Sequence, residues 1–143
     1  MKNLVCAGIA AALLAACGGG GGSTSAASSQ AGVTAPAVSA SASTVDAGNS
    51  TISGNAKDYL IKFAGSGDVT ITAQIANVWV AENQALGTLA VSGGMNTITF
   101  KAGATVKTLN VTGSGNTIYL PAGSPIVVQG TAAASTTVKY YTS

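Results

Sequence analysis

The chain lacks most of the side chains that carry enzyme chemistry. Its 143 residues contain no histidine, its six basic residues are all lysines, and it has only two cysteines. The absence of histidine excludes Ser-His-Asp and Cys-His catalytic arrangements, and the absence of arginine excludes bidentate recognition of phosphate. Histidine nitrogen is missing as a metal ligand as well, and the mature chain expected below has no unmodified cysteine sulfur. The sequence therefore predicts no catalytic residues, no metal site and no cofactor.

Charged residues are also scarce. The four acids are Asp46, Asp58, Asp68 and Glu82, which stand singly and form no Asp-x-Asp loop for calcium. Scattered carboxylates are more often solvated loop residues than paired general acids and bases. The formal net charge is +2 at pH 7, without any basic cluster. We therefore expect a protein that is not an enzyme and does not bind nucleic acid.

The longest uncharged apolar run lies at the N-terminus. It covers residues 4–16 behind Lys2, which is too short for a stable membrane span but suits a signal peptide. The run ends in Leu14-Ala15-Ala16-Cys17, which resembles the lipobox of bacterial lipoprotein signals. This resemblance implies a signal peptide over residues 1–16, cleavage before Cys17 and lipidation of Cys17. The alternatives are an ordinary secreted protein and an apolar N-terminal stub.

A lipidated Cys17 would place the protein on the bacterial cell envelope. The other cysteine, Cys6, lies in the leader, so the mature chain would have neither a free thiol nor a disulfide. Several acyl chains on one residue satisfy the requirement of two signals for firm membrane anchoring. Gly18 stands where an Asp tends to retain lipoproteins in the inner membrane of enteric bacteria. We therefore expect the outer membrane.

The segment from Cys17 to Asp46 is predicted to be a flexible linker. It opens with five consecutive glycines and continues in Ser, Ala and Thr with one proline, Pro36, and no aromatic residue. Such a composition buries too little apolar surface to offset the entropy of ordering. As a coil the linker would average about 30 Å end to end. The remaining residues, 47–143, suffice for one small domain.

One phrase of this domain occurs twice, 20 residues apart. Val91-Ser92-Gly93-Gly94-Met95-Asn96-Thr97-Ile98 returns as Val111-Thr112-Gly113-Ser114-Gly115-Asn116-Thr117-Ile118. Alternating apolar pairs around the phrase keep the same spacing, which indicates strands with one buried face. The pattern continues upstream with one residue deleted. Downstream it continues at Ile126/Val128 after a three-residue contraction and at Val138/Tyr140 in the 20-residue spacing.

The repeat predicts an all-β fold, a short parallel β-solenoid of about five 20-residue coils. Val91 would then stack on Val111, and Asn96 and Asn116 would share a corner, where asparagine tolerates left-handed backbone and bonds to its stacked copy. The alternative is a series of antiparallel hairpins that form a sandwich or barrel. Residues 73–76 lack Gly and Asn turn residues yet keep the register, which favours the solenoid.

The phrase Gly113-Ser114-Gly115-Asn116-Thr117-Ile118, with its relatives at 93–98 and 65–69, resembles a bacterial family of unknown function, number 3060 among such domains. It is also similar to adhesin-type head domains of exported proteins. The resemblance covers roughly residues 50–141. It implies a β-helical fold at the cell envelope, and these families have no catalytic residues to transfer.

Trp79 is the candidate ligand contact. If Val78 and Val80 point inward, Trp79 points outward, and its column in the solenoid continues through Thr99 and Tyr119 to Lys139. An exposed Trp79 above Tyr119 can stack on a sugar or anchor a protein partner. The alternatives are that the linker covers Trp79 or that Val78 and Val80 are the outward pair.

A second outward face is rich in hydroxyl groups. Its residues are Thr70/Thr72, Ala90/Ser92, Asn110/Thr112 and Val127/Gln129. A flat face of this kind suits polysaccharide or ordered water, and it is also what a solvated β-face looks like. The sequence therefore favours a non-enzymatic envelope lipoprotein that presents a β-solenoid for interaction or adhesion, with an envelope polysaccharide or protein as partner. The alternative is a carbohydrate-binding module that uses Trp79 and Tyr119.

Overall fold

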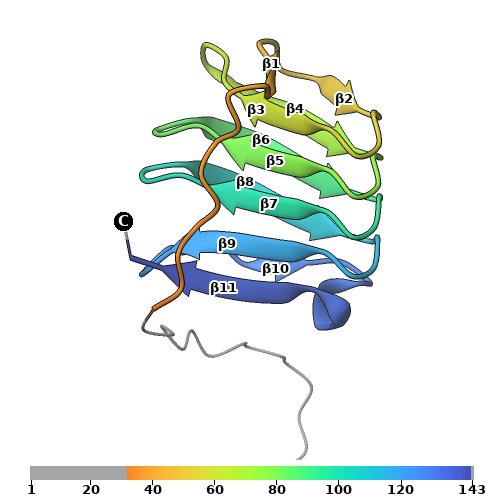
Figure 1. Ribbon diagram of the computed structural model, residues 1–143, viewed down its shortest axis with the longest axis vertical. Coiled ribbons are helices and arrows are strands. Elements are labelled where there is room, and N and C mark those ends of the chain that lie inside the picture. The colour runs from red at the N-terminus through yellow and green to blue at the C-terminus, as the bar shows by residue number, and fades with distance from the viewer. Residues whose placement is uncertain (1–31, 143) are drawn as a thin grey trace, which may run out of the picture.

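A parallel β-solenoid is the architecture of this chain (Figure 1). The computed structural model describes residues 32–142. Each coil gives one strand to a six-stranded sheet and one to a five-stranded sheet. The six-stranded sheet has the order β1 (Ser43–Val45), β3 (Asp58–Ile61), β5 (Asn77–Val80), β7 (Thr97–Phe100), β9 (Thr117–Pro121) and β11 (Thr137–Tyr141). The five-stranded sheet has the order β10 (Val128–Gln129), β8 (Thr105–Val111), β6 (Ala85–Val91), β4 (Ser66–Ile71) and β2 (Ser50–Ile52).

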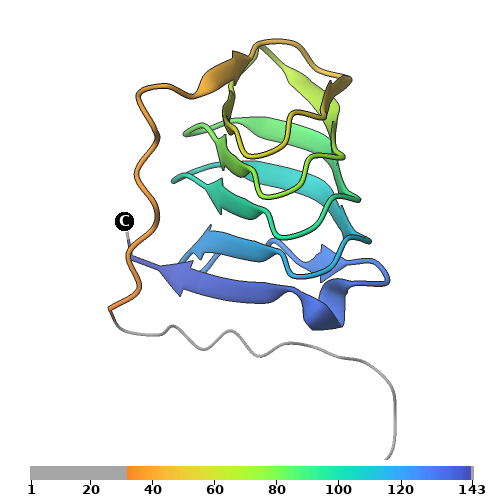
Figure 2. The same ribbon diagram turned by 45° about the vertical axis from the view of Figure 1, so that its right-hand side comes forward.

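All neighbouring strands pair in parallel, so the predicted solenoid is confirmed and the hairpin alternative is wrong. Ile98 pairs with Ile118 and Val91 with Val111, at the 20-residue spacing read from the sequence. The two sheets run side by side through all the coils (Figure 2). The one helical element is a single 3-10 turn, η1 (Ala133–Ser135), and no helix within residues 32–142 is long and apolar enough to cross a membrane.

The downstream register differs from the prediction. Val128 pairs with Leu109, 19 residues away, so the coil is shortened by one residue and not by three. A slip of two residues keeps every side chain on the same face of a strand. Apolar alternation alone therefore does not separate the two registers. Val138 does pair with Ile118, as expected.

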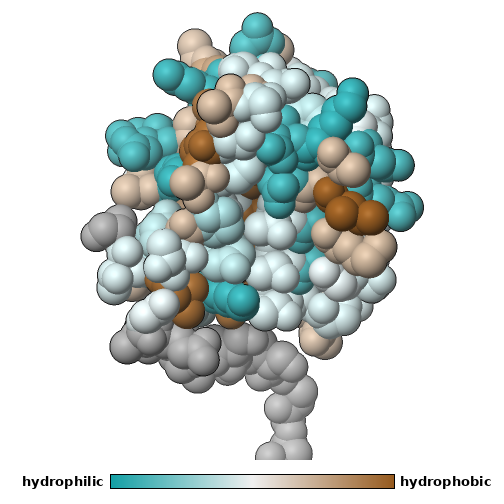
Figure 3. Space-filling view, in the orientation of Figure 1, coloured by the Kyte–Doolittle hydropathy of each residue, from teal (hydrophilic) through white to brown (hydrophobic). Residues whose placement is uncertain are grey.

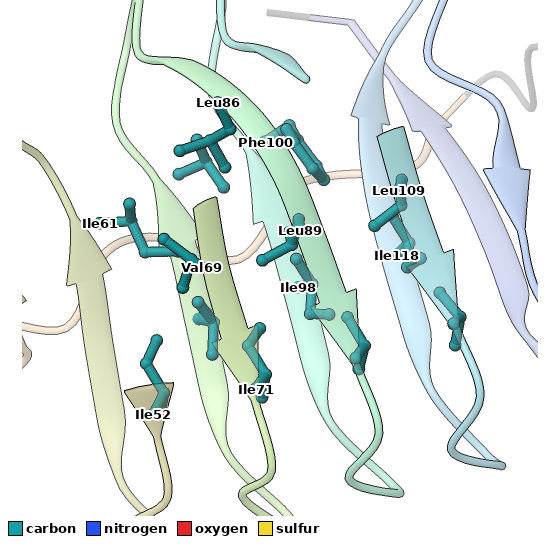
Figure 4. Packing of buried hydrophobic residues seen from close by; sticks show 14 of the residues in the cluster. Ile52, Ile61, Val69, Ile71, Leu86, Leu89, Ile98, Phe100, Leu109 and Ile118 are labelled. Carbon is teal, nitrogen blue, oxygen red and sulfur yellow. The ribbon is translucent and has the colours of Figure 1, made fainter. Parts of the chain in front are cut away.

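The space between the sheets is filled by stacked aliphatic side chains. Figure 4 shows them aligned from strand to strand, with Phe100 as the one large aromatic ring that is fully buried. Ile98, Ile118, Leu89 and Leu109 are also fully enclosed. Each such side chain contributes roughly 1.5–3 kcal/mol relative to an exposed one. The fold thus depends on apolar columns that run the length of the solenoid.

Asparagine side chains join the coils at one corner. Asn96 Oδ1 accepts a hydrogen bond from the N–H of Ala76 at 2.8 Å, and Asn116 Oδ1 accepts one from the N–H of Asn96 at 2.9 Å. The Nδ2 groups donate to backbone carbonyls of the preceding coil, at Ala73 and Gly93. Both asparagines are buried, and their bonds satisfy backbone groups that the turn leaves unpaired.

The left-handed residue of this corner lies one position before the predicted one. Positive φ angles occur at Ile75 (58°), Met95 (58°) and Gly115 (71°), and not at Asn96 or Asn116. The asparagines are held instead by their side-chain bonds. Gly113 is needed because a Cβ there would collide with the carbonyl oxygen of Gly93 in the preceding coil.

The prediction of a flexible linker over residues 17–46 is wrong for residues 33–45. Ser43–Val45 forms β1 and pairs with β3. Residues 33–42, which we call the strap, run in orange across the six-stranded sheet from beside β11 to β1 (Figures 1 and 2). The composition of the strap gave no sign of this because the surface that orders it belongs to other strands. The rest of the predicted linker, Cys17 and the signal peptide lie outside the described residues.

Candidate interaction surfaces

The outward column predicted for Trp79 is present on the six-stranded sheet. Val78 and Val80 are fully buried in the core, so Trp79 points away from it. Strand pairing aligns Trp79 with Thr99, and Thr99 with Tyr119. The same register places further outward residues at the two ends of the column, Leu60 and Lys139.

Trp79 is nevertheless covered. Its side chain is only 4% exposed, and its Nε1–H donates a hydrogen bond to the carbonyl oxygen of Pro36 in the strap at 3.0 Å. The expectation of an exposed tryptophan is therefore wrong, and the alternative, a covering linker, is what the structure has. Tyr119 is half-buried, and Lys139 Nζ lies 5.4 Å from the centroid of its ring, within the range of a cation–π contact.

Thr99 lies in the same column, between Trp79 and Tyr119. It is 1% exposed, and its Oγ1 has no hydrogen-bond partner among the described residues. A buried hydroxyl without a partner costs roughly 1–3 kcal/mol in desolvation. The covered face therefore holds one polar group that its present cover does not satisfy.

The strap makes a second polar contact near its junction with β1. Asp58 accepts a hydrogen bond from Nδ2 of Asn77 at 2.9 Å. This bond and, to a smaller degree, a bond from the Ser39 side chain lower the pKa of the Asp58 carboxyl group. Ser39 also accepts a bond from the N–H of Ala42 at its carbonyl oxygen, which closes a turn between the strap and β1.

The strap has no place in the backbone ladder of the sheet. Within residues 32–142, no backbone–backbone hydrogen bond joins residues 33–41 to the strands beneath them. β1 by contrast pairs with β3 over three residues. The strap is therefore held to the sheet through side chains of the strands, such as Trp79, whose indole N–H bonds to the Pro36 carbonyl oxygen. Figure 3 shows this face, on which pale, weakly polar surface dominates and brown apolar surface is confined to small areas.

The outward face of the five-stranded sheet has no such cover among the described residues. Strand pairing aligns Thr70, Ala90, Asn110 and Gln129 in one column. Beside it, Thr72, Ser92 and Thr112 are exposed. Their hydroxyl groups donate to carbonyl oxygens of the preceding coil at 3.3–3.5 Å, which leaves their oxygen lone pairs free to accept. We call these seven residues the hydroxyl face.

The asparagine corner carries an apolar feature that sequence reasoning missed. Ile75 is 58% exposed and Met95 is 57% exposed, and both occupy the left-handed position of their coils. A β-branched residue at positive φ is a genuine outlier. The repeat could have revealed this position, because Ile75 and Met95 stand 20 residues apart and align with Gly115, a residue type typical of left-handed backbone.

The three carboxylates of the repeats, Asp58, Asp68 and Glu82, lie in different parts of the fold. Asp58 begins β3, whereas Asp68 lies in β4 and accepts a hydrogen bond from the N–H of Thr88 at 2.6 Å. Glu82 is exposed, and its charge adds to the effect of burial in raising the pKa of Tyr141. No group of three potential metal ligands occurs within residues 32–142.

Known proteins give no further guide to these surfaces. No protein-family profile, no curated protein and no solved structure matches this chain. The resemblance to the family of the Gly-Ser-Gly-Asn-Thr-Ile phrase thus stays a prediction. What the chain binds has to be argued from the two faces themselves.

Proposed function

We propose that this chain is a non-enzymatic lipoprotein of the bacterial cell envelope, in which a short β-solenoid on a lipid-anchored tether serves interaction or adhesion. The hydroxyl face carries this proposal, because its seven residues are uncharged, recur from coil to coil and have no covering segment among the described residues. Its strands repeat at about 4.8 Å, so one contact can recur from coil to coil along an extended partner. The anchor rests on Lys2, residues 4–16 and Cys17.

The partner best suited to this face is an envelope polysaccharide. Hydroxyl and amide groups at Thr112, Asn110 and Gln129 offer donors and acceptors without a charge that would select an ionic ligand. A protein partner is the second possibility. Recognition of sugar by Trp79 and Tyr119 is less favoured than in the sequence-based hypothesis, because the strap covers Trp79.

Crosslinking in the native envelope tests this function. A photoreactive residue at Thr112 is expected to capture a polysaccharide or protein, whereas the same residue at Ala102, an exposed corner position, is expected to capture much less. Equal capture from both positions would count against the hydroxyl face as the contact.

The anchor is tested separately. Cys17→Ser is expected to release the protein from membranes and to block maturation of the leader. Membrane fractionation and the mass of the mature chain measure both effects. A Cys17→Ser protein that stays with the membrane would contradict the lipid anchor.

A further inference from the structure

The strap occupies the six-stranded sheet in the way that a bound peptide would. Its residues Val33-Thr34-Ala35-Pro36-Ala37-Val38 are small and uncharged, and none of them belongs to a helix or strand. The carbonyl group of Pro36 accepts the indole N–H of Trp79, and Pro36 itself is half-buried. Aromatic surfaces that donate such bonds are the usual partners of extended proline-containing segments, which lose little entropy when they bind.

The fit between the strap and this face is incomplete. Thr99 Oγ1 is enclosed on the covered face without a hydrogen-bond partner among the described residues. A peptide with an acceptor or donor at that point would gain a bond that the strap does not make. The face therefore has capacity for a ligand other than the one it holds.

The strap is also attached in a way that permits exchange. It shares no backbone ladder with the sheet, whereas the strands below it are fixed by backbone pairing, on both sides for β3, β5, β7 and β9, and by the buried core. Segments with few buried contacts open at a small fraction of the global free energy of unfolding. Release of the strap would uncover Trp79 and leave the solenoid core in place.

We propose that the outward face of the six-stranded sheet binds an extended, uncharged, proline-containing peptide of a partner protein. The strap is the internal competitor for this face. Because the strap is covalently joined to β1, its effective concentration is of the millimolar order, so a partner peptide must bind more tightly than the strap or arrive after the strap is displaced. This proposal rests on the proposed interaction role and names a second surface and partner class for it.

The one tryptophan of the chain makes the proposal directly measurable. In the full mature chain, Pro36→Asp places a charge at the half-buried contact with Trp79, and Ala37→Asp places the same charge at the exposed neighbouring position. We expect Pro36→Asp to red-shift the Trp79 emission and to raise its acrylamide quenching several-fold, with an unchanged far-UV circular dichroism spectrum. Ala37→Asp should match the parent protein. Pro36→Gly is the second release variant if Pro36→Asp fails to fold.

A peptide titration then tests binding. The probe is a synthetic peptide with the sequence of residues 32–42, added to the released variant, and the control peptide carries Asp in place of its proline. The first peptide is expected to restore the shielding of Trp79 and to bind the parent protein at least tenfold more weakly. Trp79 that stays quenchable at saturating peptide would overturn the proposal, as would equal binding of the control peptide or shielding by a soluble glucan instead.

The two proposals fail independently. The fluorescence measurements need neither a membrane nor an envelope partner, so a failed anchor at Cys17 leaves them unaffected. Conversely, if the peptide does not bind, the result of the crosslinking experiment at the hydroxyl face is unaffected.

Discussion

The solenoid body and the strap are ordered by different interactions. In the body, every coil is tied to its neighbours by backbone pairing, by asparagine bonds such as those of Asn96 and Asn116, and by continuous apolar columns. The strap has no such pairing, and its polar contacts are the bond from Trp79 Nε1 to the Pro36 carbonyl oxygen and the bond of the Ser39 side chain to Asp58. Damage to one coil is therefore expected to weaken the whole body, whereas damage to the strap contacts should release the strap and little else.

The largest effect is expected where two coils approach most closely. Gly113→Ala forces a methyl group against the carbonyl oxygen of Gly93, and overpacking of this kind lowers the free energy of unfolding by roughly 2–4 kcal/mol. Ser114→Ala, at the exposed neighbouring position, is the control. Denaturant unfolding followed by circular dichroism measures both. A Gly113→Ala protein as stable as the control would disprove the requirement for close stacking.

Loss of a corner asparagine should rank next. Asn116→Ala removes the acceptor for the Asn96 N–H and the donor to the Gly93 carbonyl, both in a buried corner. We expect a loss of about 2–3 kcal/mol, because buried backbone groups are left without partners. Asn110→Ala, on the hydroxyl face, is the matched control and should change the midpoint of unfolding little. Similar losses in both variants would mean that the corner has no special role.

A change in the strap should be smaller and local. Trp79→Phe keeps an aromatic ring but removes the donor to Pro36, which is worth about 1 kcal/mol for one hydrogen bond. Cleavage within residues 33–42 by a protease is expected to become about fivefold faster, while hydrogen exchange in the solenoid core stays the same. If core exchange accelerates in parallel, strap and body form one cooperative unit and the distinction between them fails.

The smallest effect concerns pH. Because hydrogen bonds lower the pKa of Asp58 in the folded protein, their stabilisation is present above the ordinary pKa of an aspartate and is lost as the pH falls through the lowered value. The contact with Ser39 should therefore persist at the ordinary aspartate pKa of about 4 and weaken only at more acidic pH, as the carboxyl group is protonated. The fluorescence emission of Trp79, followed as the pH is lowered, measures the weakening of this contact. The control is Asp58→Asn, which has no carboxyl group to protonate at this position. An identical acid response in both proteins would assign it to other groups.

The sequence predicted the body far better than the strap. Apolar alternation at a 20-residue period, as in Val91 and Val111, determines strand register because a one-residue slip would expose every core side chain. Nothing comparable marks residues 33–42, since their order depends on Trp79 and Asp58, which lie far away in the sequence.

The candidate contacts were only partly predictable for the same reason. Alternation correctly gave the direction of Trp79, but exposure depends on what lies above a side chain. The left-handed positions at Ile75 and Met95 were also unexpected. The preference of asparagine for left-handed backbone would place Asn96 at that position. The buried hydrogen bonds of its side chain outweigh this preference and hold Asn96 one position later.

The path of the strap determines how this protein would respond to mechanical tension. The strap begins beside β11, where the C-terminus also lies, and joins the solenoid only at β1, at the opposite end (Figure 1). A force applied to residue 32 and directed away from the sheet would break the contacts of the strap one after another, whereas a force directed along the stack would shear them together. Peeling of its ten residues would free a segment of about 35 Å before any load reaches β1. Under such a pull the strap would extend before the stacked coils carry the load.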